Sequence, residues 1–549
     1  MEEEEFVAIM KISLPVGIII AIVGGISIIL MCAYGGEWRK SQRIRRKLRM
    51  QGIKGPPPSS FLHGNLPDIN RINKSAHHQQ AEAVQTNSYD GARHHPHPHQ
   101  ELDFTASLFP CFEHWRKQYG LVYTYSTRMK QHLYVNQPEL VTEMNKIMTL
   151  DLGKPTHVTK NLAPLLGNGI LRSNGLSWAH QRKLVAAEFF MDKVKGMVGL
   201  MIESAQPLLK KWEELVEEEG GTAEVEVNKD LRTLAADVIS RVCFGHSYSK
   251  GKQVFSKLRF MQTTMSKHGT FLFGVKGLWD KINFLKKKEN EVSMKEMETQ
   301  IESLIWELVE ERKLECSEKP CLEKDLMQLL LEAAAIDEGL PKNSGKQFVV
   351  DNCKNIYFAG HETIAITASW CLMLLAKYPQ WQTRVRDEIV ELFPTGIPDA
   401  DSLPLLKTLN MVIQEVLRLY PAAAFVSREA YEDIQIGNLH VPKGVCLWSL
   451  IPAMNRDPEN WGQDANEFKP ERFSEGLSKA CKYPQAYVPF GLGPRTCLGK
   501  NFAIVQLKVV LALIISKFSF SLSPSYKHSP KYRMIIEPEY GVHILIRKI

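Results

Sequence analysis

The residues best suited to chemistry lie in one short segment near the C-terminus, residues 490–499, which reads FGLGPRTCLG. Its glycines, Gly493 and Gly499 among them, allow backbone shapes or close approaches that a Cβ would block, and its proline stiffens the turn. An apolar helical pattern over residues 501–515 follows, and the positive end of a helix dipole favours a thiolate at the helix start. The spacing therefore predicts that Cys497 is a metal-bound thiolate beside a flat cofactor. The simpler interpretation is a buried cysteine in a turn.

A second motif, AGHET at residues 359–363, lies inside a long apolar helical pattern over residues 348–377. Glycine inside a helix costs about 1 kcal/mol relative to alanine. Gly360 therefore indicates that a ligand approaches closely or that the helix widens locally. Thr363 could hydrogen-bond within such an opened turn. Taken alone, the motif is explained more simply by the polar face of an ordinary helix.

Charged and aromatic side chains at five further positions gain meaning only from their neighbours. Glu415 and Arg418 lie three residues apart on one face of a predicted helix, where opposite charges can meet. By itself such a pair is commonplace. Trp178 and Arg182 form a W-x-x-x-R pattern, and Arg428 follows Arg418 by ten residues. Standing alone, either Arg182 or Arg428 would be interpreted as a solvated surface residue.

Helical patterns dominate the remaining chain, for example over residues 197–218 and 295–313. Short β-like stretches also occur, but they are too few and too separated for a doubly wound sheet. They lie at residues 121–125, 132–135, 434–441 and 542–546. The predicted fold class is therefore mainly α with small β-sheets.

The composition is that of a globular protein. Apolar residues make up 44% of the 549 residues and charged residues 23%, so the chain should bury a large core. The net charge of +7 is modest and comes largely from one basic cluster, so no nucleic-acid partner is expected. The ten cysteines lack C-x-x-C spacing, which indicates reduced thiols rather than a zinc site or a disulfide framework.

The N-terminal segment predicts a membrane anchor. Residues 12–33 carry no charge, and these 22 residues are enough for a helix that crosses a bilayer. A cleaved signal peptide would have a shorter apolar stretch and a small-residue cleavage site. An uncleaved signal anchor with one transmembrane helix is therefore predicted within residues 1–38. Basic residues follow the span and glutamates precede it, which places the large domain in the cytosol.

Two further parts follow the anchor. A basic and proline-rich linker is predicted over residues 39–58, where the sequence GPPP at residues 55–58 favours a stiff spacer and a hinge. The catalytic domain then covers residues 59–549. It contains a polar stretch near residues 74–101 with six histidines, which prolines interrupt and which lack fixed ligand spacing. A mobile, exposed insertion is therefore predicted there rather than a metal site.

These motifs, in this order, resemble the cytochrome P-450 superfamily over essentially the whole chain. The resemblance implies a cytochrome P-450 fold that binds haem b (iron protoporphyrin IX), with Cys497 as the iron ligand and Phe490 near the sulfur. It also implies which side chains approach the haem propionates, namely Arg495, Trp178, Arg182 and Arg428.

The same resemblance assigns further roles. Thr363 and Glu362 are implied to support proton delivery to dioxygen from the helix distal to the haem. Glu415, Arg418 and Arg472 are implied to form a buried network that braces the haem-binding core, as structural supports rather than catalysts. An unpaired buried arginine is costly, so such partners are needed.

The implied reaction inserts one oxygen atom from dioxygen into an organic substrate while the other becomes water. Electrons must arrive from outside, because the chain lacks a G-x-G-x-x-G fingerprint for a flavin or nicotinamide. The expected partners are an NADPH-dependent flavoprotein reductase and membrane lipid, and the expected place is the endoplasmic reticulum membrane, spanned once. Lys500 and Lys508 are candidates for docking an acidic partner.

The narrower resemblance concerns the substrate. Residues 112–120, 178–183 and 469–493 look like those of plant microsomal members that oxidise gibberellins and related diterpenoids. A hydrophobic terpenoid acid is therefore the first candidate substrate and a triterpenoid the second. The alternatives are a haem-thiolate isomerase or dehydratase, against which Thr363 argues, and a non-catalytic haem protein.

Overall fold

The computed structural model describes residues 24–25, 31–32, 34–86, 103–245, 248–267, 284–318, 325–336 and 344–549. The predicted spanning segment at residues 12–33 lies outside these residues except at four positions.

Helices make up most of the described chain, which confirms the predicted mainly α fold class. The longest apolar helix is α17 (Ser344–Lys377). Among the described helices it alone is long and apolar enough to cross a membrane, but 78% of its most apolar stretch is buried inside the protein, so α17 is a core helix. The other main helices are α2 (Leu66–Thr86), α4 (Pro110–Tyr119), α5 (Pro138–Lys146), α8 (Gly175–Ala186), α10 (Val198–Glu218), α11 (Val227–Phe244), α12 (Tyr248–Lys267), α15 (Phe284–Glu318), α16 (Leu326–Ile336), α18 (Pro379–Leu392), α19 (Lys407–Leu419) and α23 (Lys500–Lys517).

Helix α17 packs against α11, α16, α19 and α23 and so organises the helical core. Helix α23 is apolar on all sides, as expected of a helix that other elements enclose. The helices predicted at residues 197–218, 348–377 and 501–515 are confirmed as α10, α17 and α23, with small shifts at their ends. The pattern at residues 295–313 lies within α15.

The largest sheet has the strand order β1-β2-β8-β5-β3, with β2 and β8 parallel and the other neighbours antiparallel. A three-stranded sheet has the order β4-β12-β9, and β6–β7 and β10–β11 are hairpins. All four predicted β-like stretches are confirmed, in β1, β2, the β6–β7 hairpin and β12. The strands are β1 (Val122–Thr127), β2 (Lys130–Val135), β3 (Leu152–Gly153), β4 (Ala223–Glu226), β5 (Phe425–Ala430), β6 (Ile434–Ile436), β7 (Leu439–Val441), β8 (Cys446–Leu450), β9 (Phe518–Leu522), β10 (Pro530–Tyr532), β11 (Ile536–Pro538) and β12 (His543–Lys548).

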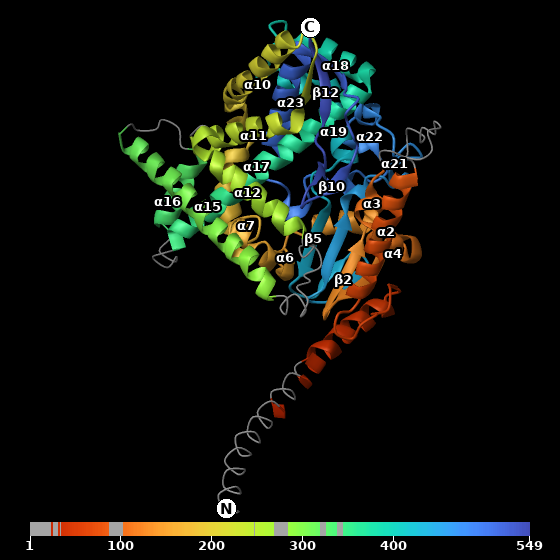
Figure 1. Ribbon diagram of the computed structural model, residues 1–549. Coiled ribbons are helices and arrows are strands. Elements are labelled where there is room, and N and C mark those ends of the chain that lie inside the picture. Colours follow the sequence, from red (N-terminus) through yellow and green to blue (C-terminus); the bar gives the residue numbers. More distant parts are fainter. Residues whose placement is uncertain are drawn as a thin grey trace, which may run out of the picture.

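The molecule has a sheet-rich side and a helical side (Figure 1). Strands β2 and β5 lie beside α2 and α4, whereas α12, α15 and α16 gather opposite them. Helix α17 runs between the two sides, so residues on it can reach both.

Residues 34–50 are helical and dock onto the catalytic domain. Leu48 is fully buried in the apolar cluster of the larger sheet. The buried Arg45 guanidinium donates to the carbonyl oxygen of Pro56. These contacts attach the segment to the folded unit, and the hinge at residues 55–58 stays a prediction.

Helix α2 extends into the predicted insertion. The polar stretch predicted to be mobile begins near residue 74, but α2 continues without a break to Thr86. Residues 74–86 are therefore helical, and the mobility of this insertion stays a prediction. The rest of that stretch, residues 87–101, lies outside the described residues.

A buried ion-pair network connects α19 to the segment around Arg472. The Arg418 guanidinium donates to both carboxylate oxygens of Glu415 at 2.7 Å, and both side chains are fully buried. Arg418 also donates to the Asn455 carbonyl at 2.7 Å. The Arg472 guanidinium lies 3.4 Å from the same Glu415 carboxylate and donates to the Trp461 carbonyl at 2.9 Å. The structure thus brings together the three residues of the implied bracing network, and their several partners make this burial tolerable.

We expect Glu415→Leu to destabilise the protein strongly, because it leaves the Arg418 guanidinium buried without a carboxylate. Breaking a buried pair from one side costs about 3–5 kcal/mol. Urea unfolding followed by circular dichroism measures the loss. The control is Glu214→Leu, which breaks the exposed Lys210–Glu214 pair and should barely move the unfolding midpoint. A similarly small effect of Glu415→Leu would contradict the bracing role.

Candidate active site

The loop that carries Cys497 is shaped by backbone hydrogen bonds. The Cys497 N–H donates to the Phe490 carbonyl at 2.8 Å. The Gly493 N–H donates to the side-chain oxygen of Asn145 on α5 at 2.6 Å. Helix α23 begins at Lys500, so the cysteine lies directly before a helix N-terminus, as predicted.

The glycines of this loop differ in what they require. Gly491 and Gly493 have φ values of +79° and +64°, in the left-handed region that side chains rarely adopt. Gly499 has an ordinary φ of −81°, and a Cβ there would meet nothing closer than Phe189 at 4.0 Å. The expectation that a Cβ is blocked at Gly499 is therefore not met by contacts within the protein.

The Cys497 side chain is accessible to solvent, although protein atoms surround much of it. Burial raises the pKa of its thiol above the ordinary value, although the Gly499 N–H, Arg182 and Lys500 act in the opposite direction. The helix N-terminus alone therefore does not produce a thiolate here, and metal coordination would have to displace the proton, as the sequence predicts for a metal-bound thiolate.

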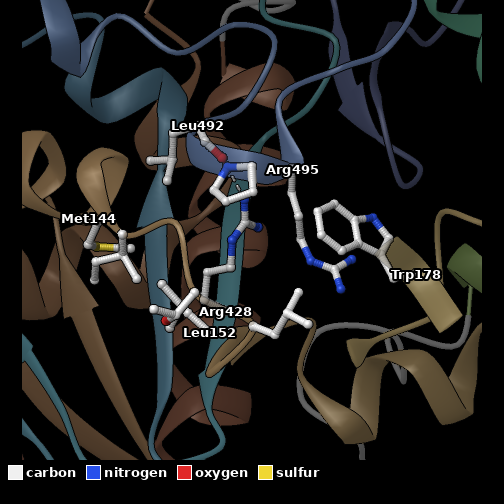
Figure 2. Close-up of a pocket in the computed structure, with 10 residues that line it drawn as sticks. Met144, Leu152, Trp178, Arg428, Leu492 and Arg495 are labelled. Carbon is white, nitrogen blue, oxygen red and sulfur yellow. Dashed lines mark hydrogen bonds between the residues drawn. The ribbon is translucent and has the colours of Figure 1, made fainter. Parts of the chain in front are cut away.

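Cationic and aromatic side chains gather beside this loop. The Arg495 guanidinium lies 4.3 Å from the centre of the Trp178 ring, and that of Arg182, on the same helix α8, lies 5.6 Å from it. The buried Arg428, on β5, donates to the Leu492 carbonyl at 3.1 Å. Figure 2 shows Arg428 and Arg495 entering one pocket, with the Trp178 ring beside Arg495. The structure therefore brings together the four side chains assigned to the propionates.

Lys154 is a further cation at this site, and no sequence pattern indicated it. The Asn174 side chain accepts from the Lys154 backbone N–H at 2.8 Å and donates to its carbonyl at 3.2 Å. Burial, followed by the charges of Arg428 and Arg495, lowers the pKa of its ammonium group to about 7. A single lysine between glycine and proline forms no motif, so only the fold could place it here.

Burial also lowers the pKa of Arg428 to about 9 and that of Arg495 to about 10. In the described part of the chain, no carboxylate forms an ion pair with either arginine, with Arg182 or with Lys154. Concentrated buried positive charge of this kind requires an anion. Planar guanidinium groups match carboxylates especially well, so the site suits a ligand that carries carboxylates.

Helix α17 contributes Thr363, which is partly exposed although most residues around it on the helix are buried. Its hydroxyl donates to the Ala359 carbonyl at 2.6 Å, and the helix stays regular, so the predicted local widening is not observed. A Cβ at Gly360 would lie 2.7 Å from Cδ1 of Ile239 on α11. The close approach that Gly360 permits is therefore that of a neighbouring helix rather than of a ligand.

Glu362 belongs to a network of buried charges. Its Oε2 accepts from Arg232 of α11 at 3.2 Å and from Arg259 of α12 at 3.0 Å, and both arginines also pair with Glu537 of β11. Burial alone would raise the pKa of the Glu362 carboxyl, but His361 and the two arginines outweigh burial and hold it below its ordinary value. Glu362 is therefore ionised at neutral pH and connects α17 to three other elements.

One predicted surface residue is corrected. Lys508 is buried and donates to the Leu403 carbonyl at 3.0 Å, so a partner cannot reach it. It lies on the inward face of α23, which the apolar pattern of that helix did not reveal. Lys500 is exposed at the start of α23.

An accessible cysteine before a helix N-terminus, beside cations that lack carboxylate partners, fits a thiolate-ligated haem, which carries iron and two propionates. The family description "Cytochrome P450" matches residues 98–545, and the chain belongs to the cytochrome P450 family. It is a haem monooxygenase, and the family implies a haem iron cofactor, a redox partner, dioxygen and a hydrophobic substrate.

Similar proteins agree with this assignment. The chain is 53% identical to Cytochrome P450 714A2 of Arabidopsis thaliana, over 93% of this chain and 95% of the relative. It is 45% identical to Cytochrome P450 714C2 of Oryza sativa subsp. japonica, over 93% of this chain and 94% of the relative. The crystal structure of the cytochrome P450DA heme domain matches with a TM-score of 0.68 at 23% identity, over 83% of this chain and 97% of that chain, which confirms the fold.

We expect Lys154→Met to have opposite effects on the haem-free and the haem-loaded protein. The folded-state pKa of about 7 lies below the ordinary 10.5, so the stability of the haem-free fold rises with pH between these values. Removing the amine should therefore raise the melting temperature of the haem-free protein near pH 7, and this gain should vanish towards about pH 10.

If the Lys154 ammonium donates to a haem propionate in the haem-loaded protein, the same substitution would remove one charge-assisted hydrogen bond. Such a bond contributes about 1.5–3 kcal/mol, so haem transfer to excess apomyoglobin should accelerate roughly 10- to 100-fold. Lys160→Met removes an exposed lysine nearby and serves as the control. Unchanged haem transfer in Lys154→Met would show that this amine does not hold the haem.

Proposed function

We propose that this cytochrome P450 oxidises a hydrophobic terpenoid, most specifically a gibberellin or a related diterpenoid acid. The observation that carries the substrate class is the resemblance of residues 112–120, 178–183 and 469–493 to plant members that oxidise these compounds. The sequence identity of the chain to plant relatives of the 714 group supports the same subfamily. A triterpenoid is the second candidate substrate.

The proposed cofactor is haem b, and several residues would hold it. Cys497 would ligate the iron through its sulfur, with Phe490 next to that sulfur and Gly493 and Gly499 against the ring. The propionates would be held by Arg495, Arg428, Arg182, Trp178 and Lys154. The support is chemical, because these cations are enclosed and lack carboxylate partners.

Bound haem iron, supplied with electrons, provides the activation of dioxygen. Thr363 has the hydroxyl that can pass a proton, since its oxygen is partly exposed while its own proton goes to the Ala359 carbonyl. Glu362 is a positioning residue in this proposal. Its ionised carboxylate, tied to Arg232 and Arg259, maintains the local field and the position of the adjacent Thr363.

The proposed electron donor is an NADPH-dependent flavoprotein reductase at the endoplasmic reticulum membrane. Lys500 is exposed beside the Cys497 loop and can approach an acidic partner. The basic residues of the helix at residues 34–50 favour an anionic membrane surface, and the apolar segment at residues 12–33 supports a single span with the catalytic domain in the cytosol.

The test begins with the reduced, carbon-monoxide-bound absorption spectrum of the full-length protein beside Cys497→Ala. A thiolate-type Soret band that disappears in the variant supports the iron ligand. Gibberellins, other diterpenoid acids and triterpenoids are then incubated with the membrane-bound enzyme, reductase and NADPH, and products are identified by mass spectrometry. Turnover of triterpenoids alone would overturn the diterpenoid proposal, and rearrangement without NADPH would indicate an isomerase or dehydratase.

We expect Thr363→Val to lower the amount of product per NADPH consumed by about tenfold or more, because a positioned proton donor is lost while the side-chain volume is kept. The lost electrons should appear as hydrogen peroxide, measured in the same reactions. The matched control is Thr367→Val, one turn further along α17, where the buried hydroxyl donates only to the Thr363 carbonyl at 2.8 Å. Equal coupling in both variants would remove Thr363 from proton delivery.

A further inference from the structure

The segment at residues 166–174, between α7 (Ala163–Leu166) and α8, is held by side chains of α17. The Asp351 carboxylate accepts from the Asn168 N–H at 2.7 Å. Asn352 accepts from the Ile170 N–H at 3.2 Å. These two bonds come from consecutive residues of α17, so one helix face binds the backbone of a segment about 180 positions earlier in the chain.

Asn355 lies one helical turn after Asp351 and completes this contact. Its side-chain oxygen accepts from the Leu171 N–H at 2.7 Å, and its amide donates to the Leu166 carbonyl at 2.7 Å. Asp351, Asn352 and Asn355 are all buried, with exposed fractions of 2%, 1% and 0%. Backbone groups that are removed from water need hydrogen-bond partners, and these three side chains supply partners to the N–H groups of residues 168, 170 and 171.

Two glycines make this close contact possible. Gly167 has a φ of +54°, and a Cβ there would lie 1.9 Å from Oδ1 of Asp351. A Cβ at Gly169 would lie 2.4 Å from Nδ2 of Asn355. The segment therefore fits α17 only as backbone, and its position is set by the three polar side chains.

The other end of the segment holds the arginine beside the cysteine loop. The Ser173 carbonyl accepts from the Arg495 guanidinium at 3.0 Å, and Oδ1 of Asn174 accepts from it at 2.7 Å. The same Asn174 oxygen accepts from the Lys154 backbone N–H at 2.8 Å. Two of the four cations at the proposed propionate site are thus positioned through residues 173–174.

We propose that Asp351, Asn352 and Asn355 are positioning residues that, through the backbone of residues 166–174, fix Arg495 and Lys154 relative to helix α17. Since Thr363 lies two turns further along α17, the contact sets one spacing in the molecule. That spacing is the distance between α17, which carries Thr363, and the cations Arg495 and Lys154, which would hold the haem propionates. This inference rests on the proposed haem site.

The test uses the full-length, haem-loaded protein and the variant Asn355→Leu, which keeps the side-chain size but removes every hydrogen bond to residues 166 and 171. The matched control is Ser369→Ala, which removes an equally buried polar group of α17 whose hydroxyl donates only within the helix, to Ala365. Asn352→Leu removes the single bond to Ile170 and is the milder variant if Asn355→Leu does not fold.

The first measurement is the rate of trypsin cleavage after Arg172, which lies inside the held segment. We expect cleavage to accelerate at least tenfold in Asn355→Leu, less in Asn352→Leu and not in Ser369→Ala. The second measurement is haem transfer to apomyoglobin, which we expect to accelerate in the same order. A merely structural role of Asn355 would lower the melting temperature of Asn355→Leu but would leave its haem-transfer rate equal to that of Ser369→Ala.

A double-mutant cycle with Arg495→Met decides whether the contact acts through that arginine. In the Arg495→Met background, Asn355→Leu should accelerate haem transfer much less than it does alone. Full additivity of the two substitutions would overturn the inference, and so would unchanged cleavage at Arg172. Failure of the wild-type protein to bind haem would overturn the proposed function together with the inference, whereas normal haem transfer in all variants would overturn the inference alone.

Discussion

The site depends on one electrostatic constraint: cations are enclosed beside the cysteine loop without carboxylates to neutralise them. Arg428, Arg495 and Lys154 all have pKa values lowered by burial, and the two arginines further disfavour the charged form of Lys154. Such an arrangement is unfavourable in the protein alone. An anionic ligand would remove the penalty, so the haem-free fold is destabilised at the site proposed for the haem propionates.

Helix α17 satisfies three demands with three stretches of one apolar helix. Its first turns hold the backbone of residues 166–171 through buried polar side chains. Its middle places Thr363 where its oxygen is partly exposed, while the adjacent Glu362 is ionised and fixed between two arginines. Its remainder packs in the core. The division follows from helical periodicity, because successive residues face different neighbours.

The segment between the predicted anchor and the catalytic domain is packed more tightly than a proline-rich spacer suggests. The helix at residues 34–50 buries Leu48 in the apolar cluster of the larger sheet. Its Arg45 guanidinium donates a hydrogen bond to the carbonyl of Pro56, inside the GPPP segment. The orientation of the catalytic domain relative to this helix is therefore determined by packing. Proline stiffness alone would have left it undetermined.

The sequence by itself determined the fold class, the main helices and strands, and the cysteine loop, because periodicity, glycine and proline act over a few residues. It also indicated Glu415 and Arg418, since opposite charges at helical spacing can pair locally, whereas Arg472 was implied only by the family resemblance. Only the tertiary structure decided which lysines are buried and which lie at the candidate site. Lys508 turned out to be buried against Leu403, and Lys154 turned out to lie among arginines from two distant segments. It likewise assigned Gly360 to helix packing and Asn355 to residues far earlier in the chain. Burial and long-range charge depend on neighbours that are remote in sequence, and no local pattern specifies them.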